Sequence, residues 1–199
     1  MTADNVKARL IRACEAIVAA QDDLTAADQA IGDGDHGLGM ARGFKAARIA
    51  LETKPAATPG ELFKLVGMAI LSTAGGASGA VFGTLFLGAA KALDGATLDA
   101  ASYAKALQAG ASAVMARGGA KAGDKTMLDA LVPAAVAAST ATNFESALAA
   151  AAEAARSGAA ATANMIATTG KAKTLGQRSL GHRDPGAISM SIILAALAE

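Results

Sequence analysis

Apolar residues recur along most of this chain at intervals of three and four positions, which is the period of an amphipathic α-helix. The first stripe contains Val6, Leu10 and Ile17 and predicts a helix from about Asp4 to Asp28. Seven further stripes, separated by breaks, predict helices over residues 38–52, 58–73, 78–93, 97–116, 124–139, 143–168 and from 185 onward. The pattern therefore predicts an all-α fold with eight helices and no strand.

Polar caps mark several of the expected helix starts. Thr58, Pro59 and Glu61 have the pattern of a capping box with a proline in the first turn. Asp184 and Pro185 repeat the cap and the first-turn proline before the last helix. Three more helix starts are expected at the polar residues Thr97, Asp124 and Asn143.

The composition fits a single helical domain. The chain has 199 residues, which is room for one substantial core and too little for two, so residues 1–199 are expected to form one domain. Hydrophobic residues make up 53% and aromatic residues 3%, and much of the apolar content is alanine, a strong helix former. A net charge of +1 offers no basic surface for nucleic acid or an anionic membrane.

One uncharged stretch, Leu65–Ala90, has the length of a membrane span. Its centre, Ser72–Gly79, is a glycine-rich polar turn that would leave backbone groups unsatisfied in lipid, so two buried helices joined by a turn are expected instead. The N-terminus lacks the apolar segment of a signal peptide. The single cysteine, Cys14, excludes an internal disulfide. We therefore expect a cytoplasmic protein that makes no contact with a membrane.

Three carboxylates lie within the eight residues from Asp28 to Asp35. Asp33 and Asp35 are separated by one glycine, so in an extended turn both side chains point to the same side, and Asp28 could close over them. Carboxylate oxygens select a hard divalent ion, and Mg²⁺ usually shares its coordination with the phosphates of a nucleotide. A solvated acidic turn that caps the following helix is the alternative interpretation.

Three familiar patterns fail in this chain. Gly32–Gly37 matches G-x-G-x-x-G, but no strand precedes it and its two aspartates would repel a pyrophosphate. An EF-hand fails because Gly37 and Phe44 occupy positions that require oxygen ligands. The segment 118–126 resembles a P-loop with one residue inserted, and it too lacks the preceding strand.

Other glycine-rich turns suit a phosphate group. Gly75–Gly79 leads into a helix whose first N–H groups and positive dipole end attract anions, with the Ser78 hydroxyl as a further donor. Close packing of these glycines is the alternative. Met127 is placed to lie against a flat base. If the turns converge at one end of a helical bundle, they form one site on a rigid scaffold.

The longest irregular piece, residues 169–183, is rich in glycine and cations, and a loop of that length in a compact domain is usually functional. Arg178, His182 and Arg183 could neutralise phosphate there. His36 and His182 are the only histidines, and because both lie in glycine-flanked polar loops we expect neither in the core. No Ser-His-Asp or Cys-His pair occurs at a recognisable spacing.

Four motifs, in this order, resemble the DhaL family, the nucleotide-binding subunits of dihydroxyacetone kinase. They are the Asp28–Gly37 turn, the Gly75–Gly79 turn, the segment Gly118–Asp129 and the segment Gly176–Ala187. The resemblance implies an eight-helix antiparallel barrel that holds ADP or ATP with two Mg²⁺ ions at one end.

The resemblance also implies roles for single residues. The family's metal ligands correspond to Asp28, Asp33 and Asp35. Its nucleotide contacts correspond to His36, Gly37, Leu38, Gly39, Ala77, Ser78, Gly118, Met127, Asp184, Pro185 and Gly186. This chain departs from the family at Lys171, where relatives usually carry an arginine, so a bidentate phosphate contact becomes a point charge. Ala77 stands where a hydroxyl residue is common.

The family's activity is shared between subunits. A partner subunit binds dihydroxyacetone covalently, while the DhaL subunit supplies the phosphoryl group. In phosphotransferase-system-linked versions a third subunit regenerates ATP from the bound ADP, and a chain that stands alone favours this version. The alternatives are an ATP-exchanging kinase subunit for a related triose or tetrose, and a nucleotide-sensing regulatory module. The sequence leaves open whether two copies form a homodimer. His36 argues against a related fatty-acid kinase domain, which usually carries threonine there.

Overall fold

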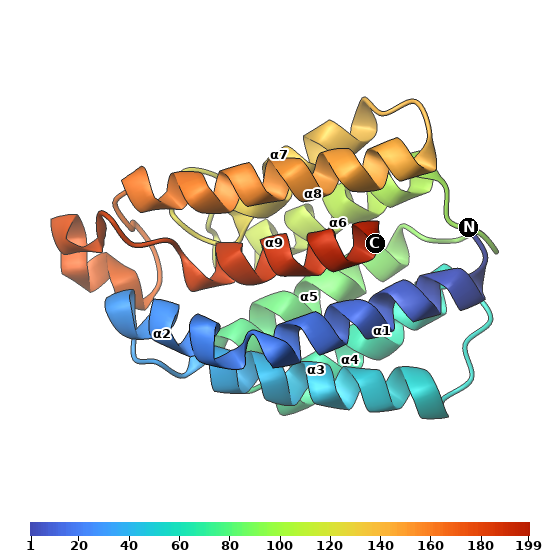
Figure 1. Cartoon of the computed structure of the whole chain (residues 1–199), viewed down its shortest axis with the longest axis horizontal. Helices are drawn as coiled ribbons and strands as arrows, with labels where there is room; N and C mark the ends of the chain where they lie inside the picture. Colours follow the sequence, from blue (N-terminus) through green and yellow to red (C-terminus); the bar gives the residue numbers. More distant parts are fainter.

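The structure, a computed structural model, describes residues 1–199 and is all-α, as predicted (Figure 1). Its α-helices are α1 (Ala3–Ala19), α2 (Gln21–Ile31), α3 (His36–Thr53), α4 (Pro59–Thr73), α5 (Gly76–Lys91), α6 (Ala100–Gly118), α7 (Leu128–Ser139), α8 (Phe144–Ala161) and α9 (Pro185–Ala198). Two 3₁₀ segments, η1 (Thr162–Asn164) and η2 (Lys171–Ser179), lie between α8 and α9.

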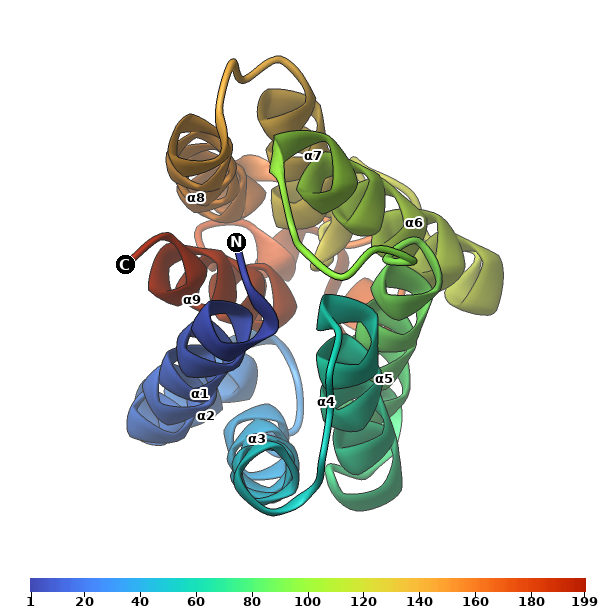
Figure 2. The same cartoon turned by 90° about the vertical axis from the view of Figure 1, so that its right-hand side faces the viewer.

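The helices close into a barrel. From α3 to α9 each helix packs against the next in the chain, and α1 packs against both α3 and α9. Figure 2 shows this ring from one end. Helix α2 extends α1 beyond the ring and packs against α3. The predicted eight-helix barrel is therefore confirmed, with its first helix in two pieces.

The break in that first helix was not predicted. Helix α1 ends at Ala19, and α2 begins at Gln21 with Asp22 and Asp23 in its first turn, where carboxylates favour a helix start. The residue between them, Ala20, is a strong helix former, so the sequence carries no breaker at this point. The apolar period continues across the break, so the hydrophobic pattern predicts one continuous helix there.

Three other expected boundaries are wrong. The side chain that caps α6 is Asp99 rather than Thr97, and it accepts a hydrogen bond from Ser102 N at 2.8 Å. Helix α7 begins at Leu128, because the backbone around the expected cap Asp124 forms an irregular turn. Helix α8 ends at Ala161 rather than near residue 168. The irregular piece expected at residues 169–183 is also not structureless, since η2 occupies much of it.

The other expected caps are present. Thr58 and Glu61 form the complete capping box of α4, and Asn143 caps α8 by accepting from Ser146 N at 2.9 Å. Asp184 caps α9 by accepting from Ala187 N at 2.7 Å. These helix starts could be predicted because a cap bonds only to residues within its own first turn.

The barrel is filled by one continuous cluster of buried apolar residues contributed by every α-helix of the ring. Glycine allows close approach between some neighbours: a Cβ on Gly83 of α5 would lie 2.8 Å from the Leu71 Cβ on α4. The uncharged stretch 65–90 forms most of α4 and α5, which are two of the helices of this ring. None of the helices is both long and apolar enough to span a bilayer.

Candidate functional site

The glycine-rich turns meet at one end of the barrel, on the left in Figure 1. They surround a pocket of about 380 Å³. Its wall includes most of the residues singled out by sequence: Asp28, Asp33, Asp35, His36, Ala77, Ser78, Gly118, Met127, Lys171, Asp184, Pro185 and Gly186. The convergence expected from the sequence is therefore present, on the rigid ends of several helices.

Three expected nucleotide contacts, Gly37, Leu38 and Gly39, lie outside the pocket wall. Gly37 is buried against α2, where a Cβ would lie 2.2 Å from the Gln21 carbonyl oxygen. Leu38 is exposed to solvent and Gly39 faces the Ala74 carbonyl oxygen on α4. In this structure these residues support the first turn of α3, and their contact with a nucleotide stays a prediction.

The acidic turn forms a compact cluster of oxygen ligands. Carboxylate oxygens of Asp28, Asp33 and Asp35 all lie within 4.8 Å of one another. Asp28 is buried near the C-terminus of α2, and its Oδ2 accepts a hydrogen bond from His36 N at 3.1 Å. The α2 C-terminus carries no basic residue in its last turn, so its negative dipole end adds to the field of the carboxylates. This arrangement suits a hard divalent cation.

Lys171, at the start of η2, reaches this cluster. Its ammonium group forms ion pairs with Asp33 and, at 3.4 Å, with Asp35. The hydrogen bond from Lys171 lowers the pKa of Asp33, and the same bond raises the pKa of Lys171. Both partners are exposed, so the pairs add little to stability. Lys171 contacts the carboxylates of Asp33 and Asp35 here, and its contact with phosphate stays a prediction.

His36 is buried, contrary to expectation. Its Nδ1 lies 2.7 Å from the Ser78 Oγ, and its Nε2 lies 2.8 Å from the Ser189 Oγ. Burial lowers the pKa of the imidazole, so the ring is neutral at pH 7 and offers one donor and one acceptor. The barrel brings Ser78 and His36 together across 42 positions of sequence, a contact that no local spacing indicates.

The Gly75–Gly79 turn shows the close packing considered for it, and it leaves a helix start without a side-chain cap. Gly75 and Gly76 have φ angles of 75° and 60°, which only glycine adopts readily. These two residues lead directly into the first turn of α5, whose N-terminus has no side-chain cap. Its first N–H groups are therefore available to an anion. Gly79 serves close packing, because a Cβ there would lie 2.9 Å from the Ala74 Cβ.

Part of the pocket wall is apolar. This apolar wall includes Val81 and Phe82 from α5, Val114 from α6, and Met127 and Leu128 at the start of α7. Apolar side chains facing a few convergent polar groups are typical of a site for a flat organic ring. Met127 therefore lines the pocket, as expected from the sequence. The lining residues of α5 and α6 were not singled out, because their sequence pattern is that of ordinary core residues.

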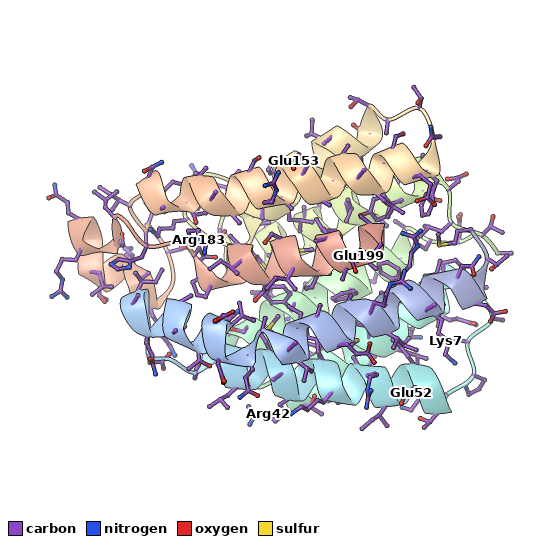
Figure 3. All side chains as sticks on the ribbon, viewed as in Figure 1. Lys7, Arg42, Glu52, Glu153, Arg183 and Glu199 are labelled. Atoms are coloured by element: carbon purple, nitrogen blue, oxygen red, sulfur yellow. The ribbon has the colours of Figure 1, made fainter.

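Three other side chains between residues 169 and 183, which were expected to neutralise phosphate, do not line the pocket. Arg178, His182 and Arg183 are exposed and absent from its wall. Figure 3 shows Arg183 near the site end of the barrel, with Lys7 and Glu52 toward the other end. The expected neutralisation of phosphate by these three side chains has no support in their positions.

Asp184, the cap of α9, lines the pocket near Asp129, Lys125 and Asp28. Burial raises the pKa of its carboxyl group to about 7, the hydrogen bond from Ala187 N opposes that rise, and the nearby Asp129 carboxylate adds to it. In the folded protein this carboxyl group therefore keeps its proton to much higher pH than in the unfolded chain, where the usual value is 3.8.

This shift predicts that the metal-free protein loses stability as the pH rises from about 4 to about 7, because only the folded state holds the Asp184 proton in that range. Asp184→Asn keeps an oxygen to accept from Ala187 N and cannot ionise. We expect the variant to gain roughly 1–3 kcal/mol over the parent between pH 5 and pH 8. Urea unfolding of both proteins without metal or nucleotide measures this difference. Parallel stability curves would contradict the burial of Asp184.

Comparisons with known proteins agree with this geometry. The model of the DAK2 domain matches residues 30–199. A relative in Listeria innocua, named the ADP-binding subunit DhaL of PEP-dependent dihydroxyacetone kinase 1, is 40% identical over 172 residues, covering 86% of this chain and 83% of the relative. The Escherichia coli K12 subunit of the same kind is 42% identical over 183 residues, covering 88% and 86%.

Solved structures show the same architecture. The dihydroxyacetone kinase of C. freundii in complex with AMP-PNP and Mg²⁺ matches the whole chain with a TM-score of 0.77 at 28% identity. The chain spans about a third of that kinase, 34% of its length. Since the domain model covers residues 30–199 and relatives about 40% identical align over most of both chains, this protein belongs to the DAK2 domain family.

Proposed function

We propose that this chain is the nucleotide-binding subunit of a dihydroxyacetone kinase, which binds ADP or ATP with Mg²⁺ and delivers a phosphoryl group to dihydroxyacetone on a partner subunit. The observation that carries the proposal is a single pocket that joins a carboxylate cluster, an uncapped helix N-terminus and an apolar wall. The names of the relatives that align over most of their length support it.

The charges of the pocket support joint binding of metal and nucleotide. Four aspartates and two lysines line it, so a free nucleotide, itself an anion, would meet a negative surface. The apolar wall suits the base, and the α5 N-terminus suits the phosphates. Divalent cations between the phosphates and the carboxylates would balance the remaining charge.

Asp28, Asp33 and Asp35 would hold two Mg²⁺ ions, because their oxygens lie within 4.8 Å of one another and belong to the donor class that Mg²⁺ prefers. The ions would bridge the phosphates and neutralise charge that develops during transfer. The chain itself contributes orientation: His36 fixes the Ser78 hydroxyl, and the α5 N–H groups hold phosphate oxygens. Phosphoryl transfer requires positioning of this kind more than a protein base.

The acceptor sugar would be supplied by a partner, because both ring nitrogens of His36 are engaged by serines and the histidine is therefore not free to anchor a triose. We propose the phosphotransferase-system-linked version, since the relatives include PEP- and PTS-dependent subunits. A tetrose acceptor is the second candidate, because the L-erythrulose 1-kinase of Mycolicibacterium smegmatis is 40% identical over 181 residues, which are 31% of its length. A cytoplasmic location is part of the proposal.

Native mass spectrometry tests the nucleotide assignment. The chain, purified without added nucleotide, is expected to carry ADP and two Mg²⁺ ions, and to lose both together when a chelator is added. Retention through dilution would support a resident cofactor, whereas rapid exchange with added ATP would support the ATP-exchanging version. Failure to bind either nucleotide at millimolar Mg²⁺ would contradict the proposal.

A further inference from the structure

Lys125 lies in the segment that resembles a P-loop, where a lysine would be expected to bind phosphate. The structure shows a different use for it. The side chain is 2% exposed, and its ammonium group donates to three backbone carbonyls: Met165 O at 3.1 Å, Ser179 O at 2.6 Å and His182 O at 2.6 Å. An ammonium group has three N–H donors, so none is left for a phosphate oxygen.

All three carbonyls belong to one segment, residues 162–184, which we call the late loop. It joins α8 to α9 at the site end of the barrel (Figure 1). The late loop carries Lys171 to the carboxylate cluster and ends at Asp184, the cap of α9. Through it Lys125 is linked to two parts of the pocket that lie far from Lys125 in sequence.

A second contact joins the same two segments. Asp124 Oδ1 accepts from the Thr168 hydroxyl at 2.6 Å, and the Asp124 carbonyl accepts from Thr168 N at 3.4 Å. The late loop is also bonded to itself, because Ala167 N donates to Ser179 Oγ at 3.1 Å. It is therefore a folded unit that is held to the 118–127 turn at adjacent residues.

The backbone at Lys125 supports a specific role for this side chain. Its φ is 61°, and it is the one non-glycine residue of the chain with a positive φ. Lysine adopts this conformation rarely, and such a conformation persists only where surrounding contacts enforce it. Here Asp129 fixes both sides of the turn, because its carboxylate accepts from Gly123 N at 2.5 Å and from Thr126 N at 2.7 Å.

We propose that Lys125 is a positioning residue for the nucleotide: it holds the late loop against the 118–127 turn, and so keeps Lys171 and the α9 N-terminus at the pocket, without binding phosphate itself. The inference rests on the proposed nucleotide site. In this proposal the lysine of the P-loop-like segment binds the late loop rather than a phosphate. This gives the lysine a role that does not depend on the strand of a true P-loop.

The first test compares the parent with Lys125→Met, which keeps an unbranched side chain as far as Cε, removes the ammonium group and leaves three carbonyls without a donor. Hydrogen exchange of the nucleotide-free proteins is expected to become at least about tenfold faster in the late loop, with α3 to α6 unchanged. Calorimetric titration with Mg-ADP is expected to show a loss of about tenfold or more in affinity, and a similar factor for Mg-AMP. The similar factor is expected because the α9 N-terminus lies beside Met127 of the apolar wall, where a Cβ on Gly186 would be 3.4 Å from the Met127 Cβ, so its displacement affects the base as well as the phosphates.

Two results would overturn the proposal. If Lys125 contacted phosphate directly, Lys125→Met would weaken Mg-ADP far more than Mg-AMP and leave exchange in the late loop unchanged. If the late loop opened without loss of affinity, its position would not matter to the nucleotide. A parent chain that binds no nucleotide would contradict the proposed function, and the exchange result would still report on the contact of Lys125 with the late loop.

Chemical rescue separates positioning from a general loss of structure. Lys125→Cys is expected to behave like Lys125→Met, and aminoethylation of the new thiol, which restores an ammonium group at lysine length, should restore both late-loop protection and Mg-ADP affinity. A Cys14→Ala background removes the only other thiol, and mass spectrometry confirms that residue 125 carries the aminoethyl group. Thr168→Val provides a second variant that leaves Lys125 intact; it should loosen the late loop to a smaller extent. Failure of aminoethylation to restore protection would count against the proposal.

Discussion

Asp35→Asn is expected to abolish retention of Mg-ADP while leaving the helical fold intact. The substitution keeps the size of the side chain but removes one charge from the three-carboxylate cluster, so the affinity for Mg-ADP should fall by about 100-fold or more, or about 2.7 kcal/mol. Asp35 is exposed and its ion pair with Lys171 adds little to stability, so unfolding without ligand should change little. Titration calorimetry and circular dichroism measure the two effects.

Thermal unfolding adds an independent measure of the same loss. Mg-ADP at 100 times its Kd should stabilise the parent by about 2.7 kcal/mol, and this gain should vanish in the variant. Asp94→Asn is the matched control, because Asp94 is also exposed but lies between α5 and α6, at the other end of the barrel. An Asp35→Asn protein that binds Mg-ADP as tightly as the parent would contradict the metal-ligand assignment.

The isolated chain is expected to form no dihydroxyacetone phosphate from Mg-ATP and dihydroxyacetone. A small polar triose must be held in line with the γ-phosphate, which requires a dedicated pocket or a covalent anchor. The site offers one pocket, which the nucleotide would fill, and its histidine is buried between Ser78 and Ser189. A coupled assay for the sugar phosphate should show turnover only after a dihydroxyacetone-binding subunit of a homologous kinase is added.

The complementary mixtures locate the chemistry. The partner with Mg-ATP alone should be inactive, and the partner with the Asp35→Asn chain should be close to inactive. The same assay with erythrulose distinguishes a triose from a tetrose acceptor. Steady turnover by the isolated chain would instead indicate a self-contained kinase with an acceptor site inside this barrel.

The all-α class and the eight helical segments could be predicted because both depend on local signals, although the first segment is divided into α1 and α2. The 3.6-residue period is present within each helix, and caps such as Thr58, Asn143 and Asp184 bond within a single turn. Two helix boundaries could not be predicted, because the local sequence favours a different structure at each of them. Ala20 favours a helix and yet lies at the break between α1 and α2, and the turn before α7 is shaped by Asp129, a residue inside that helix.

The candidate site divides in the same way. Asp33, Asp35 and Ser78 could be singled out because carboxylates spaced by one glycine, and a hydroxyl at a glycine-rich helix start, indicate their chemistry within a few residues. The resemblance to DhaL subunits extended that list along the chain. Ser189 and Lys125 could not be found, because a serine inside an apolar helix and a lysine in a turn show nothing of the partners they contact.

The sequence by itself determined the helices, most of their caps and the residue types that suit metal and phosphate, since each depends on neighbours within about one turn. Only the tertiary structure decided where the turns meet. The contacts of His36 with Ser78 and Ser189 span 42 and 153 positions, and that of Lys125 with His182 spans 57. These pairs form because the ring of helices closes between α1 and α9, and closure depends on packing across the whole barrel rather than on any local pattern.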